Sequence, residues 1–142
     1  GRYGNIPYNK PTGYGVFLPS EKRLIEQTLT NAKSVWQLNG VGCVGGQALL
    51  GIPIVDNLRK CLSTSVWPFE MENSKVVCAE IYPSIFPIED PEVFKDASQV
   101  KAVVNNFFTL DLEGQLEQLM KVPMSLNNEI ITHEGWILGA KI

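Results

Sequence analysis

The stretch from Val76 to Ser84, VVCAEIYPS, most constrains how this chain can fold. It opens with a continuous apolar run, reaches an acidic residue at Glu80 and is broken by Pro83. Continuous apolar strands are typical of parallel sheets that are covered on both faces. The run therefore predicts a buried strand over residues 75–82. It also places a carboxylate at the strand end, where α/β proteins commonly locate chemistry.

The size and charge of the chain restrict the classes of protein to which it can belong. Its 142 residues, 44% hydrophobic and 19% charged, suit one globular domain over residues 1–142. Residues 1–19 are rich in glycine and proline and are expected to form an irregular N-terminal arm. The formal net charge is −3, and the only adjacent basic residues are the pairs Lys22–Arg23 and Arg59–Lys60. This argues against a general binder of nucleic-acid phosphates, which carries a basic stripe.

The cysteines and the lengths of the apolar runs indicate the cellular compartment in which the protein is expected. Cys43, Cys61 and Cys78 are odd in number and widely spaced, which predicts three reduced thiols in a cytoplasmic protein. No run approaches the ~18 apolar residues of a membrane helix and no signal peptide is visible, so we expect no membrane partner. The sequence starts at Gly1 without an initiator methionine, which favours a processed or truncated beginning.

Helical and strand patterns alternate along the rest of the chain. Ser20 and Asp90 are suitable N-caps for helices over residues 21–30 and 91–108. The other expected elements are strands over 34–38 and 66–70 and helices over 47–50, 53–62 and 112–121. The apolar residues expected to face the core are Leu24, Ile25, Leu29, Ile54, Val55, Leu58, Leu62, Val93, Phe94, Ala97, Val100, Val104 and Phe107. Together these patterns predict a single layered α/β domain, a small mixed sheet with flanking helices.

A glycine-rich turn over residues 40–45 has the spacing G-x-G-x-x-G, after a predicted strand and before a predicted helix. In dinucleotide-binding proteins such glycines let a pyrophosphate rest on a helix N-terminus. Here the helical pattern is soon interrupted by a glycine and a proline, which favours a tight structural turn over a nucleotide site. The candidate ligand-binding residues around this turn are Gly40, Gly42, Gly45, Gln47 and Trp36.

Two acidic residues and the single histidine are the candidate chemical groups. Glu80 suits a metal ligand or general base, and it equally suits a strand end that reaches solvent. His133 is adjacent to Glu134 in THEGW, and one histidine without nearby cysteines cannot form a zinc site. We expect a surface or interface histidine there, with a proton shuttle as the alternative. The residues expected to be core anchors, or the rim of a pocket near Glu80, are Trp36, Trp67 and Trp136.

Five blocks occur in the order SVWQLNGVGCVGGQALLGIP, VWPFE, AEIYPS, KDASQV and HEGWILG. They resemble the C-terminal half of a family of uncharacterised bacterial proteins, which is similar in turn to predicted RNase H-like nucleases. The resemblance covers residues 33–140. It implies a layered α/β domain, here a truncated RNase H-like fold, in which acidic residues hold Mg²⁺ for phosphodiester hydrolysis.

Carried onto this sequence, the resemblance makes Glu80 in AEIYPS and Glu134 in HEGW the catalytic and metal-binding carboxylates, with His133 as an auxiliary catalytic group. The aspartate that such folds place on their first strand has no counterpart here. Two-metal catalysis needs clustered carboxylates, so the resemblance implies a partial or degenerate nuclease. A sheet that lacks its first hairpin also exposes an edge, which favours a homodimer.

The sequence and the resemblance lead to two functional hypotheses of different classes. The first is a degenerate or partial metal-dependent nuclease, for which the net charge leaves nucleic acid an open partner. The second is a non-catalytic module that binds a small ligand or a partner and self-associates. The nuclease requires Glu80 and Glu134 within about 6–8 Å, so that one metal ion and its water bridge them. The binding module requires an apolar pocket with few polar groups. A nucleotide-binding enzyme that uses the glycine turn is a third alternative.

Overall fold

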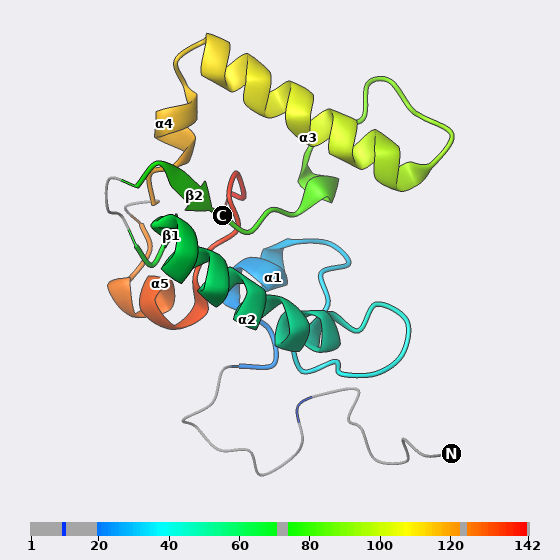
Figure 1. The fold of residues 1–142 in the computed structure, drawn as a ribbon. Coiled ribbons are helices and arrows are strands. Elements are labelled where there is room, and N and C mark those ends of the chain that lie inside the picture. Colours follow the sequence, from blue (N-terminus) through cyan, green and yellow to red (C-terminus); the bar gives the residue numbers. More distant parts are fainter. Residues whose placement is uncertain (1–9, 11–19, 71–73, 123–124, 142) are drawn as a thin grey trace.

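The computed structural model of the chain describes Lys10 and residues 20–70, 74–122 and 125–141. Helices combine with a two-stranded parallel sheet, so the structure is mixed α/β, as predicted (Figure 1). The expected N-terminal arm over residues 1–19 lies, apart from Lys10, outside the described residues. In chain order the elements are α1 Leu24–Thr28, α2 Val44–Leu62, β1 Thr64–Val66, β2 Val76–Cys78, the 3₁₀ helix η1 Pro83–Ile85, α3 Lys95–Leu112, α4 Leu116–Leu119 and α5 Asn128–Glu134.

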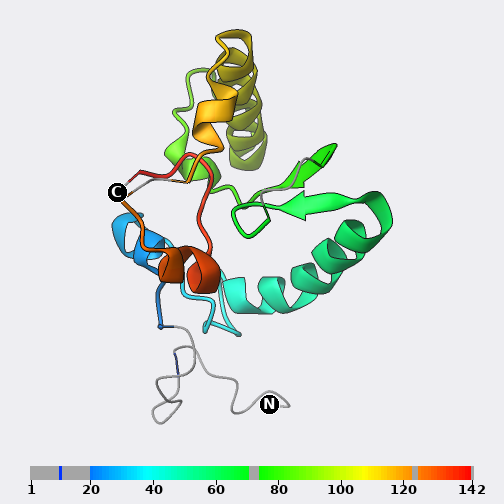
Figure 2. The same cartoon turned by 90° about the vertical axis from the view of Figure 1, so that its left-hand side faces the viewer.

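The core forms around the segment that follows α5. This segment rises from α5 toward η1 (Figure 2), and the backbone N–H of Leu138 donates to the carbonyl of Glu80 at 2.8 Å. Because the segment is apolar, it brings together residues that are distant in sequence. The buried residues of this core are Ile25, Trp67, Leu126, Trp136, Ile137, Leu138 and Ala140.

The helix α2 is continuous, whereas the sequence predicts two helices separated at Gly51 and Pro53. Both residues lie inside α2, which is drawn as an arc in Figure 2. Proline removes one helical hydrogen bond and commonly bends a helix, but a helix of this length retains the others. The expected inward face is also wrong, because three of its members are exposed: Ile54, Leu58 and Leu62. Val55 alone of that set is half-buried.

The sheet pairs β1 with β2 in parallel, with Ser65 opposite Val77. The strand predicted over residues 66–70 is displaced, because residues 67–69 turn and only Val66 belongs to β1. The strand predicted over residues 75–82 is reduced to β2. Its predicted burial on both faces is wrong as well, since Val76 is 46% exposed and Val77 is 42% exposed.

The strand predicted over residues 34–38 is absent from the described chain, and a turn occupies its place. Ser34 explains the turn, because its hydroxyl accepts the N–H of Trp36 and its carbonyl accepts the N–H of Gln37. The same hydroxyl donates to the carbonyl of Glu21. Serine side chains that bond nearby backbone in this way compete with strand formation.

The helix α3 begins at Lys95, four residues after the predicted start at Pro91. Asp90 does not cap it. Instead, Asp90 and Glu92 both bind the ammonium group of Lys101, and the Ser98 hydroxyl accepts the N–H of Glu92. The buried residues of α3 are Ser98, Ala102 and Val103, and the predicted inward set is wrong in these exposed members: Val93, Phe94, Ala97, Val100 and Val104. Phe107 is partly buried against the core, as predicted.

The remaining helices are short. α1 begins at Leu24 rather than after Ser20, although Ile25 is fully buried as predicted. The helix predicted over residues 112–121 shortens to α4 because the chain turns at Gly114, which has a φ of 67°. Within the described ranges, we find no helix with the length and apolar character needed to span a membrane.

Candidate functional site

Arg23 joins three segments of the chain at the start of α1. Its Nη1 and Nη2 atoms donate to the two carboxylate oxygens of Glu80, at 2.7 and 2.6 Å. Its Nε atom donates to Glu26 at 2.9 Å, and Nη1 also donates to the backbone carbonyl of Glu134 at 3.2 Å. Paired bonds between guanidinium and carboxylate are short and directional. We call Arg23, Glu26, Glu80 and Glu134 the Arg23 cluster.

The side chain of Glu134 also binds the start of α1. Its Oε2 atom accepts the backbone N–H of Leu24 at 2.7 Å, one of the N–H groups that a helix leaves without a partner at its start. Glu26 accepts the backbone N–H of Arg23 at 2.9 Å in addition to its contact with the guanidinium. Two carboxylates therefore hold the first turn of α1, which explains why this short helix begins at Leu24.

The charge of Arg23 is fixed by its surroundings. Burial alone would lower the pKa of the Arg23 guanidinium. The hydrogen bonds and charge of Glu80 outweigh burial, and Glu26 adds to them, so the pKa of Arg23 is raised above its ordinary value. Arg23 therefore remains a cation at every physiological pH and serves as a permanent counter-ion for the carboxylates around it.

The Arg23 cluster borders a pocket of about 430 Å³, which we call the α2 pocket. Its polar side chains are Arg23, Glu80 and Glu134. The rest of the lining is apolar or small: Ala48, Gly51, Ile52, Val55, Val66, Trp67, Phe69, Cys78, Ala79, Gly135 and Trp136. A mainly apolar wall with a few convergent polar groups is typical of small-molecule sites, and the volume falls within their usual range.

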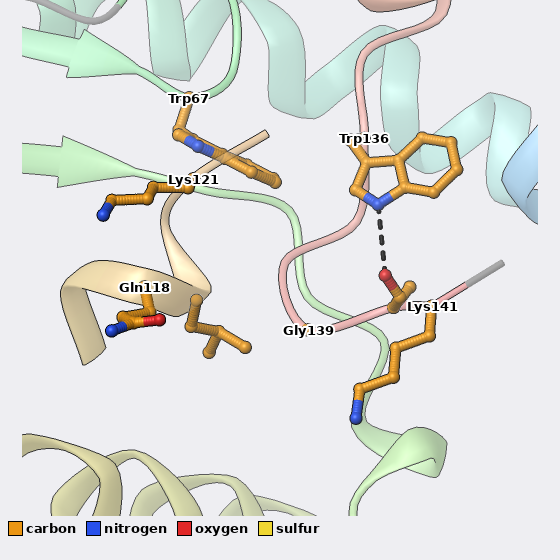
Figure 3. A pocket seen from close by; sticks show the side chains of 8 residues that line it. Trp67, Gln118, Lys121, Trp136, Gly139 and Lys141 are labelled. Atoms are coloured by element: carbon orange, nitrogen blue, oxygen red, sulfur yellow. Dashed lines mark hydrogen bonds between the residues drawn. The ribbon is translucent and has the colours of Figure 1, made fainter. Parts of the chain in front are cut away.

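A second and smaller pocket of about 160 Å³ lies beside the same two tryptophans (Figure 3). Trp67 and Trp136 line both pockets. Their indole N–H groups donate to backbone carbonyls, that of Trp67 to Met120 at 2.6 Å and that of Trp136 to Ala140 at 3.2 Å. Both rings are thus locked in place. Trp67 and Trp136 are buried core residues and also line the α2 pocket with Glu80. Trp36, the third tryptophan of the predicted set, is only half-buried and lines neither of these two pockets.

The structure brings some of the predicted site residues together and separates others. Glu80 and Glu134 both line the α2 pocket and both contact Arg23. His133 lies on the exposed surface of α5 and is not in the lining of the α2 pocket. Any shared action of His133 and Glu134 would need a ligand that extends from the pocket to the surface of α5.

The residues of the glycine turn lie at the start of α2. Gly40 and Gly42 have positive φ angles of 90° and 75°, which glycine adopts without strain. Gly45 is buried, and its N–H donates to the carbonyl of Gln37 at 3.1 Å. Gln47 is exposed. The indole N–H of Trp36 donates to the carbonyl of Ser20 at 3.2 Å. None of the candidate residues around this turn lines the α2 pocket.

The partners of the Glu80 and Glu134 carboxylates show whether these residues suit Mg²⁺. Among the residues that the structure describes, no three histidine, cysteine, aspartate or glutamate side chains are grouped so that they could hold a metal ion. Both oxygens of Glu80 are bonded to Arg23, and one oxygen of Glu134 is bonded to Leu24. Mg²⁺ prefers free oxygen ligands in octahedral geometry, which this arrangement does not present.

Arg23 is the site residue that sequence reasoning misses. In the sequence it is half of a basic pair with Lys22, which is typical of a solvated helix face. Phe69 is also missed, because it follows a proline in a segment predicted to be an irregular strand. The one available signal for Arg23 is Glu26 three residues later, a spacing that permits ion pairs on a helix.

No protein-family model, curated protein or solved structure matches this chain. The function proposed below therefore follows from the side chains of the α2 pocket and the Arg23 cluster.

Proposed function

We propose that this protein binds a small molecule in the α2 pocket, and that the ligand combines an apolar body with a positively charged group. One observation carries the proposal. The polar side chains that line this mainly apolar pocket are two carboxylates, Glu80 and Glu134, and one guanidinium, Arg23, which is itself paired with Glu80 and with the buried Glu26. This is the binding module of the sequence analysis, located at the tryptophans and Glu80 rather than at the glycine turn.

The charges favour a cation. Glu26, Glu80 and Glu134 outnumber Arg23, so negative charge remains after the guanidinium is paired. Glu80 is the accessible member, with 47% of its side chain exposed. Each carboxylate oxygen of Glu80 accepts one bond from Arg23 and has a second lone pair, so a ligand ammonium group can donate to it without the full release of Glu80 that metal coordination requires. This attraction is strongest where water is partly excluded.

The apolar wall favours a flat or branched body. Ile52 and Val55 of α2 line the pocket together with the strand residues Val66 and Cys78. Phe69 of the same lining is 54% exposed. Burying apolar area of this kind stabilises a complex by about 25 cal/mol per Å². An exposed aromatic ring that lines the same pocket as a carboxylate also suits an organic cation.

The test uses three ligands of equal size and different charge: benzylamine, benzyl alcohol and benzoate. We expect benzylamine to bind most tightly, followed by the alcohol, with binding measured by NMR shift changes and by the fluorescence of the buried tryptophans. In Glu80→Gln the affinity for benzylamine should fall at least tenfold, while that for benzoate should rise because Arg23 loses a counter-ion. Glu117→Gln, an exposed residue of α4, is the matched control. Equal binding of all three ligands, or no binding at millimolar concentration, contradicts the proposal.

A second candidate function is metal-dependent phosphodiester hydrolysis, as the RNase H-like resemblance implies. It is supported by one observation: Glu80 and Glu134, the two carboxylates that the resemblance selects, line the same pocket. For metal to bind there, Arg23 must first release Glu80, since it occupies both carboxylate oxygens.

Thermal melting with Mg²⁺ or Mn²⁺ separates the two candidates. A metal ion that binds the folded state raises the melting temperature by mass action. The nuclease candidate requires a rise in the wild type that is lost in Glu80→Gln and enlarged in Arg23→Gln, which frees Glu80. If millimolar metal leaves all three melting temperatures unchanged, nuclease chemistry is excluded as the activity of this pocket.

A further inference from the structure

Two glycines line the α2 pocket, and only one of them is covered by another side chain. A Cβ atom built on Gly135 would lie 2.7 Å from the ring of Phe69, so this ring lies directly on the bare backbone. A Cβ atom built on Gly51 would meet no atom within 4 Å beyond the backbone of its own helix. The space beside Gly51 is therefore open, whereas the space beside Gly135 is filled.

Gly51 belongs to the face of α2 that borders the pocket. The lining residues of this helix are Ala48, Gly51, Ile52 and Val55, and spacings of three and four residues place them on the same side of a helix. Ala48, Gly51 and Val55 are half-buried. Gly51 lies one turn from both Ala48 and Val55, so a side chain added at this position would enter the space that these two residues border.

Packing gives no reason for a glycine at position 51. Glycine in the interior of a helix is destabilising relative to alanine, and Gly51 lies well inside α2. Its φ angle is not positive, and no other described segment approaches it closely enough to exclude a side chain. The effect that remains is the room that the glycine leaves in the pocket.

The α2 pocket is also larger than a one-ring ligand requires. Its volume of about 430 Å³ corresponds to roughly fourteen water molecules at about 30 Å³ each, and it lies in the range of pockets that hold drug-sized molecules. Two apolar side chains of the lining, Ile52 and Phe69, are 66% and 54% exposed. A ligand body large enough to reach both would remove this apolar area from water, which favours binding.

We propose that Gly51 determines the size of the ligand, and that the ligand class is an amine whose apolar body has the size of a two-ring system. The inference rests on the proposed function, in which Glu80 binds the ammonium group. The outer part of the apolar body lies against the bare backbone of α2 at Gly51. A larger side chain at position 51 occupies this space and leaves room for a one-ring amine only.

The test compares benzylamine with naphthylmethylamine and biphenylmethylamine, which carry the same aminomethyl group on larger apolar bodies. Binding to the full chain is measured by NMR titration. The wild type should bind the two larger amines at least tenfold more tightly than benzylamine, and both should shift the amide signal of Gly51. Gly51→Leu should weaken binding of the larger amines at least tenfold and change the affinity for benzylamine less than about threefold, because added volume excludes only the larger bodies. Gly51→Ala should give an intermediate loss.

The matched control is Asn57→Leu, because Asn57 is an exposed residue of α2 outside the pocket lining. It adds a leucine to the same helix and should leave all three affinities unchanged. Circular dichroism verifies that the variants fold. Equal losses for the three amines in Gly51→Leu, or a preference for the larger amines that Gly51→Leu retains, would overturn this inference and leave the proposed function standing. If the wild type binds none of the amines at millimolar concentration, the proposed function fails and this inference fails with it.

Discussion

At the scale of single residues, two glycines of α2 occupy opposite environments. A Cβ atom built on Gly45 would lie 1.9 Å from the carbonyl oxygen of Val35 and 2.7 Å from a methyl group of Leu38. A Cβ atom on Gly51 would meet nothing within 4 Å. The absence of a side chain is therefore required at Gly45 and only tolerated at Gly51.

This contrast gives a matched pair of substitutions. Gly45→Ala should destabilise the protein by about 2 kcal/mol, because the turn before α2 must move to admit the methyl group. Gly51→Ala should stabilise it by about 0.5–1 kcal/mol, because alanine is the better helix former. Urea unfolding measures both, and equal transition midpoints for the two variants would contradict the assigned packing.

Arg23 gives the second prediction at this scale. Glu26 is only 4% exposed, so Arg23→Gln leaves a buried carboxylate without its cation. Breaking a buried pair in this way should cost about 3 kcal/mol. Arg59→Gln, which removes a half-exposed ion pair with Glu70, should cost less than about 1 kcal/mol. Chemical denaturation of the two variants and the wild type tests this difference.

At the scale of elements, α3 presents two adjacent phenylalanines to different surroundings. Phe107 packs edge to face against Phe86, with ring centroids 5.4 Å apart, and Phe108 is 62% exposed. Phe107→Ala should therefore cost about 3 kcal/mol and Phe108→Ala less than about 1 kcal/mol. Thermal unfolding followed by calorimetry measures both. A larger loss for Phe108→Ala would place the other face of α3 against the core.

The sequence predicts elements better than their limits, because distant contacts decide the limits. The helix near Ile25 is expected from periodicity, but its start is set by Glu134, 110 residues away from Leu24. The strand expected over residues 34–38 fails because a serine hydroxyl bonds its own backbone. The inward face of α3 is mispredicted because small residues, Ser98 and Ala102, are buried where larger ones are exposed.

The residues of the candidate site can also be predicted from the sequence only in part. Glu80 can be selected from the sequence as an acidic residue within an apolar run, whereas Glu134 is selected only by the RNase H-like resemblance. Their roles as site residues remain predictions. Arg23 cannot be selected, since Glu26 lies at an ion-pair spacing from Lys22 as well as from Arg23. Only the fold places the guanidinium between the end of β2 and the end of α5.

At the scale of the whole molecule, the segment after α5 supplies much of the core. Trp136, Ile137 and Leu138 are each 4% exposed or less, and they contact elements from both halves of the chain. A chain ended after Gly135 should therefore lose cooperative unfolding, whereas Lys141→Ala, an exposed change, should preserve it. Near-ultraviolet circular dichroism and thermal melting distinguish these results. A sharp transition in the shortened chain would show that the core forms without this segment.

The carboxylate of Glu134 at the start of α1 also has a consequence for biosynthesis. A ribosome adds residues in order, and domains often begin to fold as they emerge. Leu24 leaves the ribosome 110 residues before the group that accepts its N–H. Throughout that interval Arg23 and the apolar face of α1 have no native partner from the end of the chain. The nascent polypeptide must therefore remain incompletely folded until its synthesis has passed the core segment, which makes it a natural client for chaperones that bind exposed apolar chain.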